Sequence, residues 1–414
     1  MSDARSAIEM IASHRPPYLM TSDPGSFARQ TIVERKPQII RSVLAEHAYP
    51  ADIVVALRAF RVEIASGSVQ PLHEDAPDVA FWHAQWRPHE GRSWLELPWY
   101  FAETYFYRRL LEAVRYVQPG PWQGVDPFAP QKRAQEVAAI TQIRDVWPSL
   151  ATISPQDRFS SLFHACLWGN RADLSNLTVK EQAVGDTTTE RHHIIIDHTE
   201  RVEELLSCGL HEVAFINDNV GADSLFDLVL SDHLLTEGLA RRVTFHLKPQ
   251  PFFVSDAMPA DIRHIIDHLN GGPDDDLTRL ATRLKDALAT GSLRLETDPF
   301  WATSLFFSEL PTALSEQLEY AGLIILKGDV NYRRLLEDRH WPPTTDLGGV
   351  AAGFPRPFVA LRTLKGELIA GLQPGQAESL AAADPAWLIN GKRGLIHLIT
   401  DEAESRQPTS STTP

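Results

Sequence analysis

Short apolar runs alternate with helical patterns in the second half of the chain, and this alternation limits the possible folds more than any other feature. Five runs rich in β-branched or apolar residues lie at 194–196, 213–216, 243–247, 323–326 and 358–361. Between two of them, isoleucines and a leucine recur every three or four residues over 259–269, which predicts an amphipathic helix. Strands that alternate with helices are typical of crossover units on a mainly parallel sheet. We therefore predict a three-layer α/β/α, Rossmann-like catalytic domain over residues 191–404.

Residues 1–190 are predicted to form a mainly helical N-terminal domain. In its first part, apolar residues recur with an approximate 3.6-residue period that is interrupted near Pro37. A second helix is predicted over 100–117, and a third before Trp168. The end of the chain, 405–414, is polar and rich in Pro, Ser and Thr, so we predict a disordered tail there.

Charge and cysteine content exclude several classes of protein. Of the 414 residues, 39 are basic and 54 acidic, and the formal charge of -15 disfavours nucleic acid and anionic membranes as partners. Cys166 and Cys208 form no CxxC pair, which indicates a reducing compartment and argues against disulfides and against a structural zinc site. Neither a membrane span nor a signal peptide is apparent. We expect a cytoplasmic location, with a nuclear one as the alternative, and the sequence fixes no oligomeric state.

Acids, amides and cations follow four of the predicted strands, at the edge where ligands bind in open α/β sheets. Asp218 and Asn219 follow the run that ends at residue 216, and Asp256 follows the next run. The segment 329–333 follows the fourth run, and Lys365 follows the fifth. Since the carboxyl ends of parallel strands meet at one edge, we expect these side chains to gather in one site.

The residue types point to a site for a metal and an anion. Asp218, Asn219 and Asp256 offer three hard oxygen donors, which suit Mg²⁺ or Mn²⁺ and suit zinc poorly. Lys365, Arg333 and the backbone amides near residue 221 would hold an anion beside the metal. The alternative is that Asp218 and Asn219 only cap the following helix and that the two cations lie on the surface. Their joint position at strand ends favours the phosphate site.

Two other chemistries find little support. His192, His193, His198 and His211 lie around one predicted strand, but they lack the HxxxH spacing of a metal site on a helix. A serine hydrolase is disfavoured because the chain contains no G-x-S-x-G turn.

Several motifs also carry a resemblance to a known family: DNVGADSLFDLVLSDHLL, FFVSD, ILKGDVNYRRLLEDRHWP and LRTLK. In this order they resemble the damage-control phosphatases first catalogued as domain of unknown function 89. The RTxK motif, Arg362 to Lys365, points to the subfamily that acts on sugar phosphates and includes proteins named acidic-residue, or protein-glutamate, methyltransferases. Segments of the helical half, among them SFARQTIVERKPQII and LWGNRADLS, are similar as well, so the resemblance covers nearly the whole chain.

The resemblance implies roles for individual residues. Asp218, Asn219 and Asp256 would bind a divalent metal and take part in catalysis. The residues that would contact substrate are Asp218, Asn219, Asp223, Asp256, Asp329, Val330, Asn331, Tyr332, Arg333 and Lys365. The family motif usually reads D-N-x-G-x-E, whereas this chain has Asp223 in place of the glutamate. We therefore expect Asp223 to contact substrate or water rather than the metal.

Motifs and resemblance together predict a metal-dependent phosphatase with a damage-control role. Its expected substrates are phosphomonoesters of small reactive sugars, such as fructose 1-phosphate or fructose 6-phosphate. Manganese is the expected metal, with nickel, cobalt and magnesium as alternatives. Whether water or Asp218 attacks phosphorus stays open at this stage.

Two other functions remain as alternatives. One is a protein-glutamate O-methyltransferase that uses S-adenosylmethionine, but the turn NDNVGAD has one glycine and two aspartates, a composition that favours a metal over an adenosyl group. The other is a non-catalytic protein that binds sugar phosphates, for which a metal beside the phosphate would be unnecessary.

Overall fold

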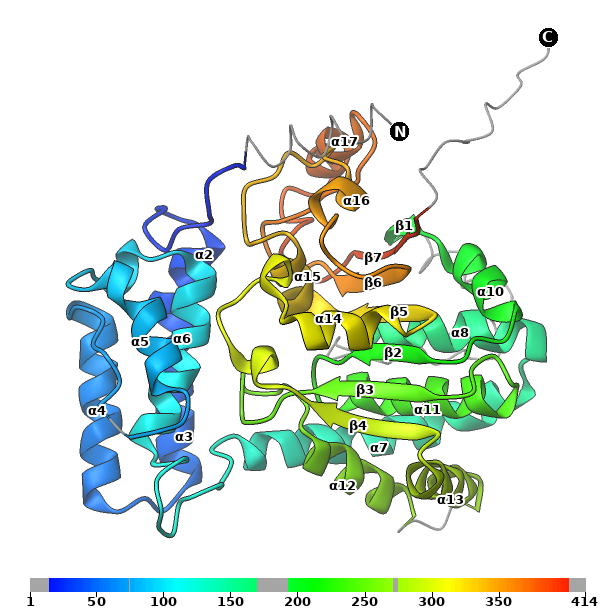
Figure 1. The fold of residues 1–414 in the computed structure, drawn as a ribbon, viewed down its shortest axis with the longest axis horizontal. Helices are drawn as coiled ribbons and strands as arrows, with labels where there is room; N and C mark the ends of the chain where they lie inside the picture. The colour runs from blue at the N-terminus through cyan, green and yellow to red at the C-terminus, as the bar shows by residue number, and fades with distance from the viewer. Residues whose placement is uncertain (1–14, 74, 170–192, 271–274, 402–414) are drawn as a thin grey trace.

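The computed structural model describes residues 15–73, 75–169, 193–270 and 275–401. A group of helices from the N-terminal part of the chain lies beside an α/β part that contains one large sheet (Figure 1). The predicted tail 405–414, His192 and most of the LWGNRADLS segment lie outside the described residues. Among the described helices, none is both long enough and apolar enough to cross a membrane.

The helical part is built around one buried helix, α6, in which every side chain from Trp99 to Leu111 is buried. Pro37 lies in the first turn of α3, directly after a π-helix, which explains the interrupted period seen in the sequence. The helices in this part are α2 (Phe27–Gln30), the π-helix η1 (Thr31–Arg35), α3 (Lys36–Glu46), α4 (Ala51–Ser66), α5 (Val79–Trp86), the short 3₁₀ helices η2 (Arg87–His89) and η3 (Trp94–Glu96), and α6 (Trp99–Ala113).

Within the described residues, the sheet has seven strands in the order β1-β7-β6-β5-β2-β3-β4. The five predicted runs form β1 (Ile194–Asp197), β2 (Val213–Ile216), β3 (Val243–Leu247), β5 (Leu323–Lys327) and β6 (Phe358–Thr363), and two further strands are β4 (Leu293–Thr297) and β7 (Gly394–Ile399). β4, β3, β2, β5 and β6 are parallel, whereas β7 runs antiparallel to β6 and β1 runs parallel to β7. The prediction of a mainly parallel sheet is confirmed.

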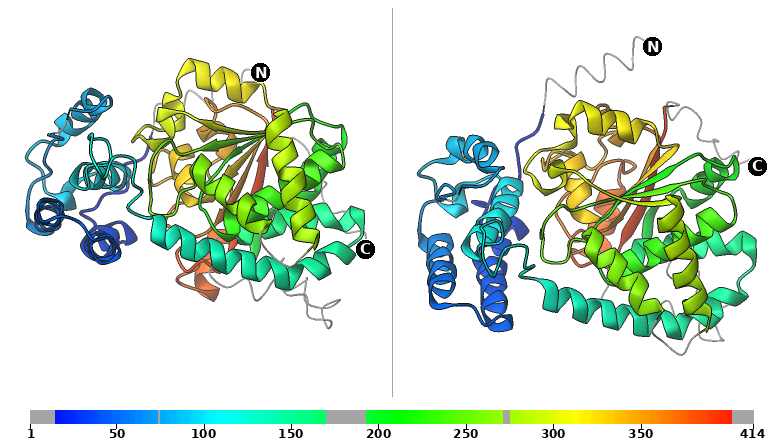
Figure 2. Two further views of the ribbon diagram at one scale, coloured as in Figure 1. Left: turned by 90° about the horizontal axis from the view of Figure 1, so that it is seen from below. Right: turned by 60° about the horizontal axis from the view of Figure 1, so that its bottom comes forward.

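Helices cover both faces of the sheet (Figure 2), because neighbouring strand residues point to opposite sides. Val213 and Phe215 belong to one hydrophobic core, and Ala214 and Ile216 to the other. The first face is covered by α7 (Ala129–Thr152), α8 (Pro155–Trp168), α10 (Thr199–Ser207), α11 (Ala222–Thr236), α12 (Pro259–Leu269) and α13 (Asp275–Thr290). On the second face lie η5 (Pro299–Ala302), η6 (Phe307–Glu309), α14 (Thr312–Glu319), α15 (Gly328–Leu335), α16 (Leu347–Val350) and α17 (Gln376–Ala383). The three-layer α/β/α architecture is thereby confirmed.

The helices α7 and α8 lie within the predicted N-terminal region 1–190, yet their buried side chains join the core on the first face of the sheet. We therefore propose that the α/β domain includes α7 and α8, and that the helical domain ends before Ala129. This division assigns each helix to the core in which its apolar side chains are buried.

The helical part lies beside the carboxyl ends of β2, β3 and β4, toward which the arrowheads point in Figure 1. Phe252 and Phe253, in the loop after β3, are buried in the hydrophobic core of the helical part. The ring of Tyr107, on α6, lies 5.0 Å from that of Phe253, centroid to centroid. The loop that continues to Asp256 is therefore anchored in both parts of the molecule.

Candidate active site

The loops after β2 and β3 are joined directly by backbone hydrogen bonds. Asn219 and Asp256 form an antiparallel β-bridge. The backbone N–H of Ala257 donates to the carbonyl of Asp218 at 2.9 Å, and the N–H of Val220 donates to the carbonyl of Ser255 at 2.8 Å. This pairing brings the three predicted metal ligands to one place, as expected from their positions at neighbouring strand ends.

The two acids of this group are buried together. Asp218 is 4% exposed and Asp256 is 1% exposed. Burial raises the pKa of Asp218 well above its usual range, and the carboxylates of Asp256 and Asp223 raise it further. Burial also raises the pKa of Asp256, although Lys248 opposes this effect from 3.2 Å. Two buried carboxylates that repel each other would both be stabilised by a cation placed between them.

The hydrogen bonds of this group leave an oxygen atom of Asp256 that could bind such a cation. Asn219 donates from Nδ2 to Oδ2 of Asp218 at 2.6 Å, and its Oδ1 accepts from the Ser255 hydroxyl at 2.6 Å. No described residue donates a hydrogen bond to Oδ1 of Asp256, although this atom is buried. A buried oxygen without a hydrogen bond is costly unless something else satisfies it. The residues therefore fit a small, oxygen-preferring divalent metal.

The loop that carries Asp256 is strained just before this residue. Phe253 and Val254 have φ values of +44° and +67°. Left-handed backbone is unfavourable for a bulky or β-branched residue, and such strain persists only where surrounding contacts hold it. Here the aromatic core of the helical part holds Phe253, so packing far from the strand end sets the position of Asp256.

A glycine at the start of α15 makes room for Asp218. Gly328 has a φ of +82°, and a Cβ atom at this position would collide with the Asp218 carboxylate. Two independent constraints therefore require glycine here, since the backbone conformation disfavours side chains and the carboxylate occupies their space.

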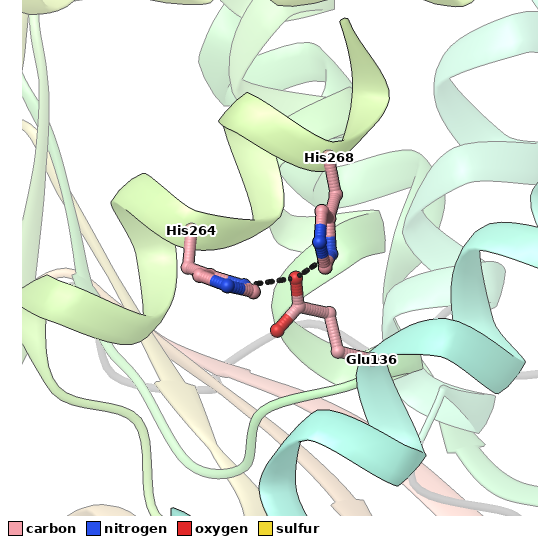
Figure 3. A group of neighbouring side chains, drawn as sticks. All are labelled: Glu136, His264 and His268. Atoms are coloured by element: carbon pink, nitrogen blue, oxygen red, sulfur yellow. Dashed lines mark hydrogen bonds and ion pairs between the residues drawn. The ribbon is translucent and has the colours of Figure 1, made fainter. Parts of the chain in front are cut away.

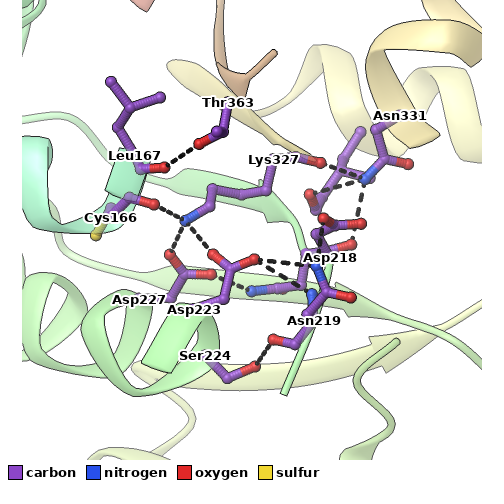
Figure 4. A network of polar contacts seen from close by, with 12 residues as sticks. Cys166, Leu167, Asp218, Asn219, Asp223, Ser224, Asp227, Lys327, Asn331 and Thr363 are labelled. Carbon is purple, nitrogen blue, oxygen red and sulfur yellow. Dashed lines mark hydrogen bonds and ion pairs between the residues drawn. The ribbon is translucent and has the colours of Figure 1, made fainter. Parts of the chain in front are cut away.

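A buried lysine organises the floor of the site (Figure 4). Nζ of Lys327 lies 2.8 Å from Asp223 and 2.6 Å from Asp227, and donates to the carbonyl of Cys166 at 2.7 Å. Burial alone would lower the pKa of Lys327, but the two carboxylates outweigh it and raise this pKa. Burial raises the pKa of Asp227 to about 6 despite the lysine. Lys327 therefore fixes Asp223, whose other oxygen faces the backbone N–H of Asn219 at 3.4 Å.

Sequence reasoning missed Lys327 and Asp227. Asp223 and Asp227 are four residues apart in α11, a spacing that places two side chains on one helix face. The available signals in the sequence were this pair of acids and a lysine at the end of the otherwise apolar strand β5.

Asp329 links two buried arginines. Its oxygens accept from Nε of Arg333 at 2.7 Å and from Nε of Arg362 at 2.7 Å. Burial would raise the pKa of Asp329, but the two guanidinium groups outweigh it and hold this pKa well below its usual range. Arg333 also donates to Asp338 at 2.8 Å, and its guanidinium lies 4.0 Å from the centroid of the Trp99 ring. The predicted substrate residues Asp329 and Arg333 thus form one rigid ionic network.

The other residues of the predicted substrate segment support the backbone. Asn331 donates from Nδ2 to the carbonyls of Ile216, Asn217 and Lys327, and so ties the end of β2 to the end of β5. The hydroxyl of Tyr332 bonds the backbone of Ala370, and its ring lies 4.4 Å from the Arg362 guanidinium. The partly buried Val330 packs against both the helical core and a sheet core.

Lys365 faces the acids from the end of β6. Its side chain is partly buried. Burial lowers its pKa, while the carboxylates of Asp218, Asp223 and Asp329 oppose this effect. The structure therefore brings Lys365 within the electrostatic reach of three predicted site residues, as an anion site requires.

The helical part contributes a second cation, which sequence reasoning also missed. The pKa of Arg35, at the end of η1, is raised first by Tyr107 and then by carboxylates that include Asp329 and Asp256. Its side chain is open to solvent. Arg35 and Lys365 thus both interact with Asp329 from different parts of the chain, and each also interacts with one of the two buried acids, Arg35 with Asp256 and Lys365 with Asp218. A π-helix widens one turn and often occurs at functional sites.

Contacts within the helical part and between the two parts hold this turn in position. Thr31 accepts a hydrogen bond from Nε1 of Trp99 at 2.7 Å. Trp99 in turn packs on Arg333. The N–H of Phe27, in α2, donates to the Glu367 carboxylate at 3.1 Å, two residues beyond Lys365. The RTxK loop and the start of the helical part are therefore fastened together.

Ligands bind at the carboxyl edge of open α/β sheets, and here this edge carries buried carboxylates and flanking cations. The comparisons with known proteins agree. The family model of the damage-control phosphatase ARMT1-like domain matches residues 31–380, so the chain belongs to the damage-control phosphatase family. This confirms the resemblance found in the motifs, and membership supports a phosphatase role in metabolite repair.

Similar proteins share most of their length with this chain. The damage-control phosphatase ARMT1 of Rattus norvegicus is 31% identical over 92% of this chain and 98% of its own. The protein of the same name from Homo sapiens is 29% identical, again over 92% and 98%. A solved DUF89 family protein from Pyrococcus horikoshii superposes with a TM-score of 0.49 at 14% identity and covers 90% of this chain and 97% of its own.

Proposed function

We propose that this chain is a metal-dependent phosphatase that hydrolyses phosphomonoesters of small reactive sugars, such as fructose 1-phosphate and fructose 6-phosphate. The observation that carries the proposal is the buried pair of Asp218 and Asp256. One oxygen of Asp256 lacks a hydrogen bond, and Lys365 lies within electrostatic reach of Asp218. A cation between the acids and an anion beside the lysine would neutralise this set of charges.

Asp218, Asn219 and Asp256 would hold the metal, with Mn²⁺ as the favoured ion and Ni²⁺, Co²⁺ and Mg²⁺ as alternatives. A metal bound there supplies Lewis-acid polarisation of the phosphoryl oxygen. The neighbouring residues keep these ligands in place: Lys248 pairs with Asp256, and Ser255 orients the amide of Asn219. A cytoplasmic location stays a prediction from the cysteine content.

The cations would provide the charge that phosphoryl transfer needs. Lys365 and Arg35 would face the phosphate from the α/β part and the helical part, and so neutralise negative charge in the transition state. Asp329, Arg333 and the amide of Asn331 would hold the wall of the site rigid, because their hydrogen bonds are directed to neighbouring protein groups.

Purified full-length protein tests the proposal when it is incubated with a panel of sugar phosphates, with and without Mn²⁺, Mg²⁺, Co²⁺ and Ni²⁺. We expect release of inorganic phosphate from fructose 1-phosphate or fructose 6-phosphate in the presence of metal. Methyl transfer from S-adenosylmethionine to glutamate side chains, without phosphate release, would support the methyltransferase instead. Binding of the sugar phosphates without turnover under any metal would indicate the non-catalytic alternative.

Lys365→Ala is expected to lower kcat/KM for fructose 1-phosphate about 100- to 1,000-fold, the scale seen when one charge-stabilising group is removed. Thermal unfolding should barely change, because this side chain is only partly buried. Steady-state kinetics and a melting curve measure the two effects. The control is Lys392→Ala, which removes an exposed lysine close by in the chain and should keep full activity. Equal kinetics of both variants would place Lys365 outside the site.

A further inference from the structure

A second group of metal-ligand side chains lies away from the site described above. Nδ1 of His264 and Nδ1 of His268 each lie 2.6 Å from Oε1 of Glu136 (Figure 3). Among the described residues, these three form the one group of His, Cys, Asp and Glu side chains close enough to hold a metal ion, with one ligand atom from each within 4.8 Å of the others. His264 and His268 have the HxxxH spacing, which the four histidines around β1 lack.

Two helices position the group. His264 and His268 are four residues apart in α12 and project from one face of it, and Glu136 points toward them from α7. An ion pair near the start of α12 fixes the two helices: Nζ of Lys132 lies 3.0 Å from the Asp261 carboxylate. The three side chains therefore converge because the backbone brings them together.

The burial of the three residues also suits a ligand site. Glu136 has a side chain that is 2% exposed, whereas the side chains of His264 and His268 are 37% and 45% exposed. Arg133 donates to the other oxygen, Oε2, at 2.8 Å, so it orients the carboxylate and leaves Oε1 directed at the imidazoles. One face of the group thus stays open to solvent.

We propose that Glu136, His264 and His268 bind a zinc ion. Two imidazoles and one carboxylate form a ligand set of zinc, with water at the fourth position. Tetrahedral ligands at zinc lie about 3.3 Å apart for bonds of ~2.0 Å, so small rotations of these side chains would complete the geometry. Hard-oxygen sites such as that of Asp218 prefer other metals, so the two sites differ in chemistry. The absence of paired cysteines excludes only zinc sites that depend on cysteine ligands, and the proposed ligands here are histidine and glutamate.

Zinc at this position would cross-link α7 to α12. Pro259, the first residue of α12, comes three residues after Asp256, so a fixed α12 also fixes the end of the loop that carries this acid. Zinc should therefore stabilise the folded chain, because it binds the folded state in preference to the unfolded one.

Zinc titration of metal-free, full-length protein tests the proposal, with a colorimetric chelator as competitor. The experiment uses Asp218→Asn as the background, so that the proposed phosphatase metal site does not add to the count. We expect the background protein to bind one more equivalent of zinc than the same protein with His264→Ala and His268→Ala. The control is His340→Ala, which removes a histidine of similar exposure, 47% for its side chain.

A second measurement guards against misfolded variants. Zinc should raise the melting temperature of the background protein by a few degrees and leave that of the double histidine variant unchanged. Glu136→Gln, which keeps the shape of the side chain, should weaken zinc binding in the same way. Equal zinc uptake by the background protein and the folded double variant would overturn the proposal, and so would a loss of zinc in the His340→Ala control.

Discussion

Replacing Asp218 with asparagine is expected to reduce kcat/KM for fructose 1-phosphate by at least about 1,000-fold. The substitution keeps the shape of the side chain but removes one of the two negative charges that would hold the metal. Since burial and then the neighbouring carboxylates raise the pKa of Asp218 in the metal-free protein, loss of its charge removes a desolvation cost and relieves repulsion. The melting temperature without metal should therefore stay the same or rise. Phosphate-release kinetics and thermal melts of the same preparation measure both effects.

The matched control is Asp346→Asn. Asp346 is exposed and caps α16, where each of its two carboxylate oxygens accepts a hydrogen bond from a backbone N–H group. Asparagine keeps one of these acceptors and is itself a good helix cap, so activity should equal that of the unmodified protein and stability should fall by no more than about 1 kcal/mol. A purely structural Asp218 would show the reverse pattern, with lower stability of the Asp218→Asn variant and nearly normal activity of whatever remains folded.

Gly328→Ala should lower kcat/KM at least about 100-fold, since displacement of a reacting group by 1 Å has an effect of this size. The added Cβ collides with the Asp218 carboxylate, and the positive φ of residue 328 disfavours alanine as well. The loss should appear in kcat and in metal affinity, because the substitution displaces a proposed ligand without removing it. Steady-state kinetics at increasing Mn²⁺ concentrations measure both.

Gly353→Ala provides the control for this substitution. A Cβ at Gly353 meets no atom within 4 Å, and its backbone lies outside the left-handed region. This variant should behave as the unmodified protein. Full activity of Gly328→Ala at ordinary Mn²⁺ concentrations would show that the position of Asp218 does not matter for turnover.

The strands that the sequence revealed are rich in apolar or β-branched residues; β2, β3, β5 and β6 are fully buried, and β1 is partly buried. β4 was missed because it carries Arg294 and Glu296 among its five residues, so it forms no continuous apolar run. β7, Gly394–Ile399, is buried and apolar, but a run of this length fits a buried helix segment equally well. The sheet order and the antiparallel direction of β7 depend on pairings between distant segments, which no local pattern encodes.

The part of the site that follows from the parallel direction of the strands was predictable. Asp218, Asn219 and Asp256 meet because parallel strands end at one edge, and the bridge between their loops follows from this geometry. The contact of Lys327 with the carbonyl of Cys166 was not predictable, since the two residues are 161 positions apart. Arg35 was missed for the same reason: only the packing of the helical part brings η1 toward the strand ends.

Removal and return of the metal test the central claim most directly. Full-length protein is treated with excess EDTA, dialysed, and assayed for release of phosphate from fructose 1-phosphate before and after Mn²⁺ is added back. We expect turnover to vanish with the chelator and to recover with Mn²⁺, while Asp218→Asn stays inactive in both states. Undiminished phosphate release in excess EDTA would contradict a metal-dependent phosphatase.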